Sequence, residues 1–196
     1  RLVGWRDPPR LVLAAFVGAA GFCQFGVIAA LGDVAEGLGR PGPEETIAGQ
    51  VGLSGTALGV GLAVIRLASL GALPLAGTAD RIGRRRTLRW WCGLGVALTA
   101  VAALSPTYAV FVAVFALSRP LLTATNTVAG VAAAELTASG DRAKAMALVA
   151  AAYGVGSGLI AVVRGVAGDA LGFRGVFALA LAPLALVAAL GPRVAE

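Results

Sequence analysis

The sequence predicts an all-α membrane protein with six transmembrane helices, and three observations support that fold class. First, 58% of the 196 residues are hydrophobic and only 13% are charged, whereas an ordinary soluble domain carries roughly 25% charged residues. Second, several apolar runs reach the length of about 20 residues that a helix needs to cross a hydrocarbon core about 30 Å thick. Third, most of the arginines stand at the ends of these runs.

The apolar runs divide the whole chain, residues 1–196, into six expected spans. We predict helices at about 11–31, 51–76, 88–104, 107–134, 144–168 and 173–191. Pro106 follows the third run and Pro192 follows the sixth, and proline resists continuation of a helix. The runs are too long and alternate too little for barrel strands. The longest connection, residues 32–50, is expected to be a solvated external loop.

The distribution of positive charge predicts the orientation of the spans. Of the 16 Lys and Arg residues, eleven lie on one side, in both terminal segments and in the loops after the second and fourth spans. The other side has two, Arg40 and Arg174. Because cytoplasmic segments carry an excess of Lys and Arg, we expect a multi-pass protein of the plasma (inner) membrane with both termini in the cytoplasm.

The composition also excludes several classes of function. There is no histidine, so His-based metal sites and Ser–His or Cys–His nucleophile pairs are excluded. Cys23 and Cys92 lie in or beside apolar runs and are expected to be buried thiols without a disulfide. A nucleic-acid-binding surface would need basic residues spread over a soluble face. We therefore expect no catalytic residue, no metal, no cofactor and no nucleic acid.

The segment at residues 77–86, between the second and third spans, reads G-T-A-D-R-I-G-R-R-R. Its two glycines, Gly77 and Gly83, would allow a tight loop between the helices. Its aspartate could accept hydrogen bonds from helix-end amides, and its arginines could contact anionic headgroups. The segment resembles the G-x-x-x-D-R-x-G-R-R/K signature of the major facilitator superfamily, and it has the same position between helices. The resemblance implies a conformational latch, for which we expect Gly77, Asp80, Arg81, Gly83, Arg84, Arg85 and, as partner of a loop arginine, Glu135.

Two further segments support this resemblance. Residues 172–177, G-F-R-G-V-F, are similar to the family's G-W-R-x-x-F before helix six, with Phe173 in place of tryptophan. Arg119 stands where the family often has a mid-membrane arginine, although the Gln and Gly of the family's R-x-x-Q-G motif are missing. The resemblance covers essentially the whole chain. It implies half of a major facilitator fold, with spans one to three and four to six as two inverted repeats, and a second, C-terminal six-helix half outside this chain.

Polar residues inside the spans mark a candidate binding site. Arg66 and Arg119 lie near the middle of spans two and four, with no Asp or Glu in the central part of any span. Spans three and six have almost no interior polar residues, which agrees with the family arrangement in which these two face lipid, so we expect them on the periphery. The candidate substrate-binding residues are Arg119, Arg66, Asn126, Thr123, Gln24 and Tyr153. The alternative for each arginine is a structural hydrogen bond to carbonyls of a neighbouring helix.

The resemblance implies a secondary active transporter that moves a small solute across the bilayer by alternating access, and the polar residues inside the spans agree with this. The unpaired central arginines favour an anionic solute, because a buried guanidinium needs a counter-charge or a full set of acceptors. A carboxylate from the second half is the competing explanation. A six-helix membrane channel and a non-transporting membrane scaffold remain the alternative functions.

Overall fold

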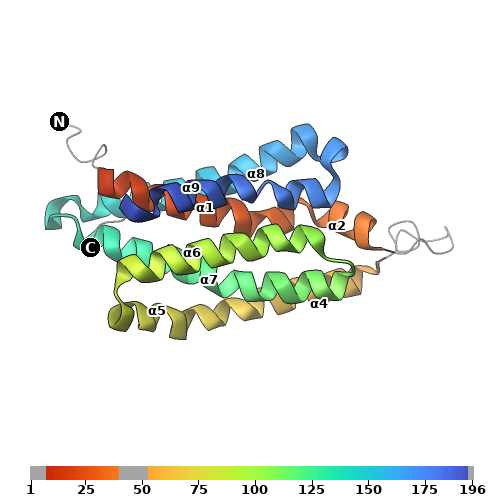
Figure 1. Ribbon diagram of the computed structural model, residues 1–196, viewed down its shortest axis with the longest axis horizontal. Helices are drawn as coiled ribbons and strands as arrows, with labels where there is room; N and C mark the ends of the chain where they lie inside the picture. The colour runs from red at the N-terminus through yellow and green to blue at the C-terminus, as the bar shows by residue number, and fades with distance from the viewer. Residues whose placement is uncertain (1–7, 40–52, 194–196) are drawn as a thin grey trace.

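The structure is a computed structural model that describes residues 8–39 and 53–193 (Figure 1). All regular secondary structure in these ranges is helical. The prediction of six membrane-crossing helices is confirmed, because six helical segments are long and apolar enough to span a bilayer. These segments are Arg10–Ala29, Gly55–Ile82, Arg84–Leu104, Tyr108–Glu135, Ser139–Gly168 and Ala170–Arg193.

The long helices lie roughly along one common direction, as Figure 1 shows. They are α1 (Pro8–Ala29), α4 (Gly55–Ala68), α5 (Ala72–Ile82), α6 (Arg84–Val101), α7 (Tyr108–Glu135), α8 (Arg142–Ala178) and α9 (Leu181–Leu190). The short elements are α2 (Leu31–Leu38) and the 3₁₀ turns Ser69–Gly71, Ala102–Leu104, Ser139–Asp141 and Gly191–Arg193. Span two consists of α4 and α5 joined by the turn at Ser69–Gly71. Helix α8 contains the end of span five and the beginning of span six, and it is kinked at Gly172, which has a φ of 59°.

Two expected loops are helical instead. Span two continues as α5 to Ile82, so Gly77 and Asp80 lie in a helix, and only Gly83 separates α5 from α6. Gly83 adopts a φ of 95°, which glycine tolerates because it has no Cβ atom. After span one, the chain forms α2, so part of the expected loop at 32–50 is also helical. The remainder of that loop, from residue 40 onward, lies outside the described residues.

Helix α1 lies at the centre of the bundle and packs against α6, α7, α8 and α9. Its residues Phe16, Val17 and Ala20 are fully buried. The contact with α8 is so close that a Cβ atom added to Gly156 would overlap the backbone carbonyl of Gly18. Small residues at such a crossing let two helix backbones approach each other, which is a common way to stabilise helix pairs in membranes.

The expectation that spans three and six lie on the periphery is only partly correct. Helices α6 and α9 lie next to each other, and each exposes large apolar side chains: Trp90 and Leu94 on α6, and Leu186 on α9. Spans two and five, however, are more exposed than spans three and six among the described residues. The absence of polar side chains predicted a lipid-facing span three, but only one side of α6 is exposed. On its other side Leu88, Cys92 and Val96 are fully buried.

Candidate functional site

The guanidinium of Arg119 lies between three spans. Its Nη1 donates a hydrogen bond to the backbone carbonyl of Gln24 on α1 at 3.1 Å, and its Nε donates to Oγ of Ser69 at 3.3 Å. Ser69 opens the 3₁₀ turn between α4 and α5. Pro120 follows Arg119 inside α7. Both acceptors are neutral, so these contacts position the guanidinium without neutralising its charge.

The side chain of Gln24 connects this arginine to spans four and five. Gln24 is only 3% exposed. Its Oε1 accepts a hydrogen bond from the Tyr153 hydroxyl at 3.0 Å, and its Nε2 lies 3.5 Å from Oγ1 of Thr123. Thr123 in turn donates to the backbone carbonyl of Arg119 at 2.9 Å. We call these five residues, Gln24, Ser69, Arg119, Thr123 and Tyr153, the polar cluster.

The polar cluster brings together four of the six predicted substrate-binding residues. Arg66 and Asn126 stand outside its hydrogen bonds. Arg66 is exposed on α4, one turn before Ser69. Within the described part of the chain, no carboxylate forms an ion pair with Arg119. The cluster therefore holds a positive charge among neutral groups, next to the buried α1.

A groove of about 700 Å³ runs between α7 and α8 and meets the polar cluster at Tyr153. Asn126 lines the same groove, so it shares an accessible space with the cluster although it forms no part of its hydrogen bonds. Glu135 and Arg142 lie farther along, near the end of the bundle. The remaining lining residues are Thr127, Gly130, Val131, Ala134, Met146, Val149 and Ala150. The groove is mostly apolar, with polar groups at its two ends.

The second predicted site is a set of ion pairs at the junction of α5, α6 and α7. Arg84, in the first turn of α6, pairs with Asp80 on α5 at 3.5 Å and also with Glu135 at the end of α7. The Arg84 side chain is 28% exposed, and the two carboxylates are more exposed. The expected proximity of Asp80, Arg84 and Glu135 is therefore present, and one arginine connects three helices.

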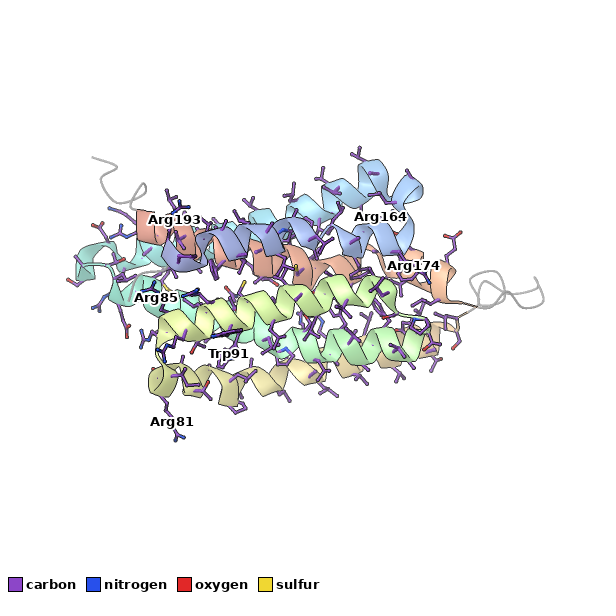
Figure 2. The ribbon with its side chains drawn as sticks, viewed as in Figure 1. Arg81, Arg85, Trp91, Arg164, Arg174 and Arg193 are labelled. Carbon is purple, nitrogen blue, oxygen red and sulfur yellow. The ribbon has the colours of Figure 1, made fainter. Side chains whose placement is uncertain are left out.

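Two of the predicted local contacts of the latch, the turn at Gly77 and the capping by Asp80, are not present in the structure. Gly77 lies within α5 and faces open space, so it makes no turn. Asp80 caps no amide at the start of α6, where Gly83 is the N-cap and no side chain accepts from the helix. Arg81 is exposed and points away from the bundle (Figure 2). Arg85 donates through Nη2 to the backbone carbonyl of Pro192 at 3.0 Å, so it connects α6 to the 3₁₀ turn that follows α9.

Sequence reasoning missed two features of the site. Ser69 is not among the predicted residues, although its position three residues after Arg66 places it on the same side of the helix. Asp33 was placed in a solvated loop, but it forms a two-point ion pair with Arg164 on α8. The apolar residues Leu31, Val34 and Leu38 follow helical spacing and could have indicated that the chain continues as a helix past span one.

Comparison with known families agrees with this architecture. Residues 11–194 match the family model described as Major Facilitator Superfamily, which extends over nearly all of the 196 residues. None of the curated proteins compared with the chain matches it. The proteins of this family are transporters. The family match and the six membrane-crossing helices show that the chain belongs to the Major Facilitator Superfamily and is a multi-pass membrane protein of the transporter type.

Proposed function

We propose that this chain is the N-terminal half of a secondary active transporter that binds a small anionic solute at the polar cluster and moves it by alternating access. The observation that carries the proposal is the environment of Arg119. Its guanidinium is held by two neutral acceptors from different spans, and no carboxylate of the described residues neutralises it. Charged groups inside a membrane protein are costly and commonly belong to a substrate pathway.

The donor count of the guanidinium supports an anionic solute. An arginine side chain offers five N–H donors, and the hydrogen bonds of Arg119 to Gln24 and Ser69 use two of them. An anionic carboxylate or phosphate could accept from the remaining donors in a two-point arrangement that suits the planar guanidinium. The neighbouring hydroxyl of Tyr153 and the amide of Gln24 would provide further polar contacts for such a solute.

The competing explanation assigns the counter-charge of Arg119 to a carboxylate from the second half of the transporter. In that arrangement Arg119 would be a structural element between the halves, and the solute could be neutral or cationic. The contact with the Gln24 carbonyl fits the structural role as well, because it resembles an arginine that is held by helix carbonyls. Substitution of Arg119 by lysine separates these possibilities.

A second half is supported by the faces that this chain leaves open. The glycine pairs Gly55/Gly59 on α4 and Gly154/Gly158 on α8 have no atom within 4 Å of an added Cβ, and their spans are the two most exposed ones. Small residues at four-residue spacing favour close helix contacts in membranes. We therefore infer that a second six-helix half packs against spans two and five and covers the groove between α7 and α8. The inverted-repeat relationship of the two three-helix units stays a prediction.

The charge distribution supports cytoplasmic termini. Arg81, Arg85 and Arg193 lie at one end of the bundle, whereas Arg164 and Arg174 lie at the other (Figure 2). Because Lys and Arg accumulate on the cytoplasmic side, the first end would face the cytoplasm of an inner or plasma membrane. The ion pairs of Arg84 lie at that same end. We propose that they form a latch that closes and opens as the transporter changes between its two states.

The test compares Arg119→Lys with Arg174→Lys in binding and transport assays on the reconstituted full-length transporter, using a panel of anionic, neutral and cationic solutes. Lysine keeps the charge but loses two-point hydrogen bonding. If Arg119 binds an anion, its substitution lowers solute affinity about tenfold or more, since hydrogen bonds to charged groups contribute roughly 1.5–3 kcal/mol. Folding should be preserved, and Arg174→Lys should leave affinity unchanged.

A different result would support the structural explanation. In that case Arg119→Lys lowers the thermal stability of the protein and changes its conformational equilibrium, while the affinity for solute stays the same. Binding of only neutral or cationic solutes, unaffected by Arg119→Lys and by Arg66→Lys, would rule out the anionic substrate.

A further inference from the structure

A second groove, of about 790 Å³, separates α6 from α9 on the outer face of the bundle that does not contain the polar cluster. The ionisable residues that line it in the described part of the chain are two arginines, Arg86 and Arg89. Two tryptophans, Trp90 and Trp91, lie beside them. The other lining residues are Gly93, Leu94, Ala97, Leu184, Val187, Ala188 and Gly191. One end of the groove is therefore basic and aromatic, and the rest is apolar.

The arginine Arg89 and the end of α9 are held together at the basic end. A Cβ atom on Gly191 would stand 3.2 Å from Nε of Arg89, so the arginine side chain lies directly over the glycine. The neighbouring Arg85 donates to the carbonyl of Pro192 at 3.0 Å. These contacts join the first turns of α6 to the last turn of span six, and they fix the place of the positive charge at the mouth of the groove.

The dimensions of the groove match one leaflet of a bilayer. From Arg86 to Ala97 the helix advances by eleven residue steps, which correspond to a rise of about 17 Å. Half of a hydrocarbon core measures about 15 Å. Trp90 is 74% exposed, and indole rings prefer the interface between headgroups and acyl chains. Trp91 lies at the same end of the bundle as Arg85 and Arg193 (Figure 2). The basic end thus lies at headgroup level and the apolar part at acyl-chain level.

We propose that the groove between α6 and α9 binds an anionic glycerophospholipid, with its phosphate at Arg86 and Arg89 and one acyl chain along the apolar part. The two helices belong to membrane spans, so lipid is the surrounding medium and an acyl chain is a natural occupant of the apolar part. The guanidinium groups select for negative charge, because a zwitterionic headgroup would bring its own cation to a mouth that is already positive. Gly93 forms part of the floor and leaves open space where a side chain would project.

The experiment measures quenching of tryptophan fluorescence by lipids with brominated acyl chains. The chain is placed in phosphatidylcholine nanodiscs with a minor fraction of brominated phosphatidylglycerol or, in a parallel sample, brominated phosphatidylcholine. Trp5 is replaced by Phe in every variant, so that only Trp90 and Trp91 report. We expect stronger quenching by phosphatidylglycerol than by phosphatidylcholine at the same mole fraction. The preference should fall about fivefold with Arg86→Gln and again with Arg89→Gln, since each basic residue near the surface contributes about 1 kcal/mol.

Two further variants separate a bound lipid from general attraction to the basic end. Arg81→Gln removes the same charge from the same end but outside the groove, and it should keep the preference for phosphatidylglycerol. Gly93→Leu places a side chain in the apolar part of the groove without a steric clash and leaves every arginine in place. It should exclude the acyl chain and therefore lower quenching by both lipids. Equal quenching by the two lipids in the parent protein would overturn the proposal. So would a loss of preference in Arg81→Gln as large as the loss in Arg89→Gln.

Discussion

The carboxylate of Asp33 accepts two hydrogen bonds from the guanidinium of Arg164, with donor–acceptor distances of 3.1 and 2.6 Å. Asp33 belongs to α2, which extends span one, and Arg164 belongs to α8, which forms span five. The Asp33 side chain is only 11% exposed, whereas that of Arg164 is 36% exposed. This ion pair connects the two spans at the end of the bundle opposite to the Arg84 ion pairs. Asp33 balances the charge of Arg164, so this arginine needs no anionic substrate as a counter-charge.

The first prediction concerns this pair. Asp33→Asn should lower the free energy of unfolding by about 1–2 kcal/mol, which lies between the values for exposed and buried ion pairs. Thermal unfolding in detergent micelles, followed by circular dichroism, would measure the change. The matched control is Glu36→Gln, because Glu36 is exposed on the same short helix. The exchange of the two charges in Asp33→Arg/Arg164→Asp should recover part of the loss, and equal stability of Asp33→Asn and Glu36→Gln would contradict the prediction.

The second prediction concerns the bridge from Arg84 to Asp80 and Glu135. Asp80→Asn should reduce the rate of transport about tenfold or more while membrane insertion stays normal, because a coupling of 1–3 kcal/mol between two states changes their ratio by about 5–150-fold. Transport into liposomes and the amount of protein in the membrane are the two measurements. Asp141→Asn is the control, since Asp141 pairs with Lys144 and lies outside the bridge. Undiminished transport in Asp80→Asn would remove the latch from the mechanism.

The third prediction compares the two glycines of the motif. Gly83→Ala should destabilise the protein by about 1–3 kcal/mol, because residues with a Cβ atom rarely adopt a positive φ. Gly77→Ala should have no cost and can stabilise α5 by up to about 1 kcal/mol, since alanine favours helix over glycine and the space beside Gly77 is open. Thermal unfolding of both variants tests this contrast. Equal losses at the two positions would show that Gly77 has a role beyond its place in the helix.

The fourth prediction concerns the crossing of α1 and α8. Gly156→Val should destabilise the bundle by about 1–3 kcal/mol or prevent folding, because the new side chain overlaps the backbone of Gly18 and overpacking forces the helices apart. Gly158→Val on the same helix projects into open space and should fold normally as an isolated chain. Size-exclusion chromatography and thermal unfolding distinguish the two. A folded Gly156→Val protein of unchanged stability would mean that α1 and α8 do not approach closely.

The number of spans and the family could be predicted from the sequence, because both depend on local properties. An apolar run of sufficient length indicates a membrane helix wherever it occurs. The motif around Asp80 is continuous along the chain. The polar face of helix four was also recognisable, because Arg119 and Thr123 are four residues apart. The end of span two differs from the prediction for a local reason too: the polar residues after residue 76 are typical of a loop, although they continue the helix to Ile82.

The sequence by itself therefore determined an all-helical, six-span membrane protein with one strongly basic end and arginines inside its spans. Only the tertiary structure decided the partners of Arg119 and Arg164. Arg164 meets Asp33, which is 131 residues away along the chain, and Arg119 meets the carbonyl of Gln24, which is 95 residues away. Such pairings depend on how the helices cross and rotate about their axes, and the crossing of α1 and α8 is set by the packing of small residues such as Gly18 and Gly156. Hydropathy and spacing along one helix contain no information about the neighbour that will stand opposite.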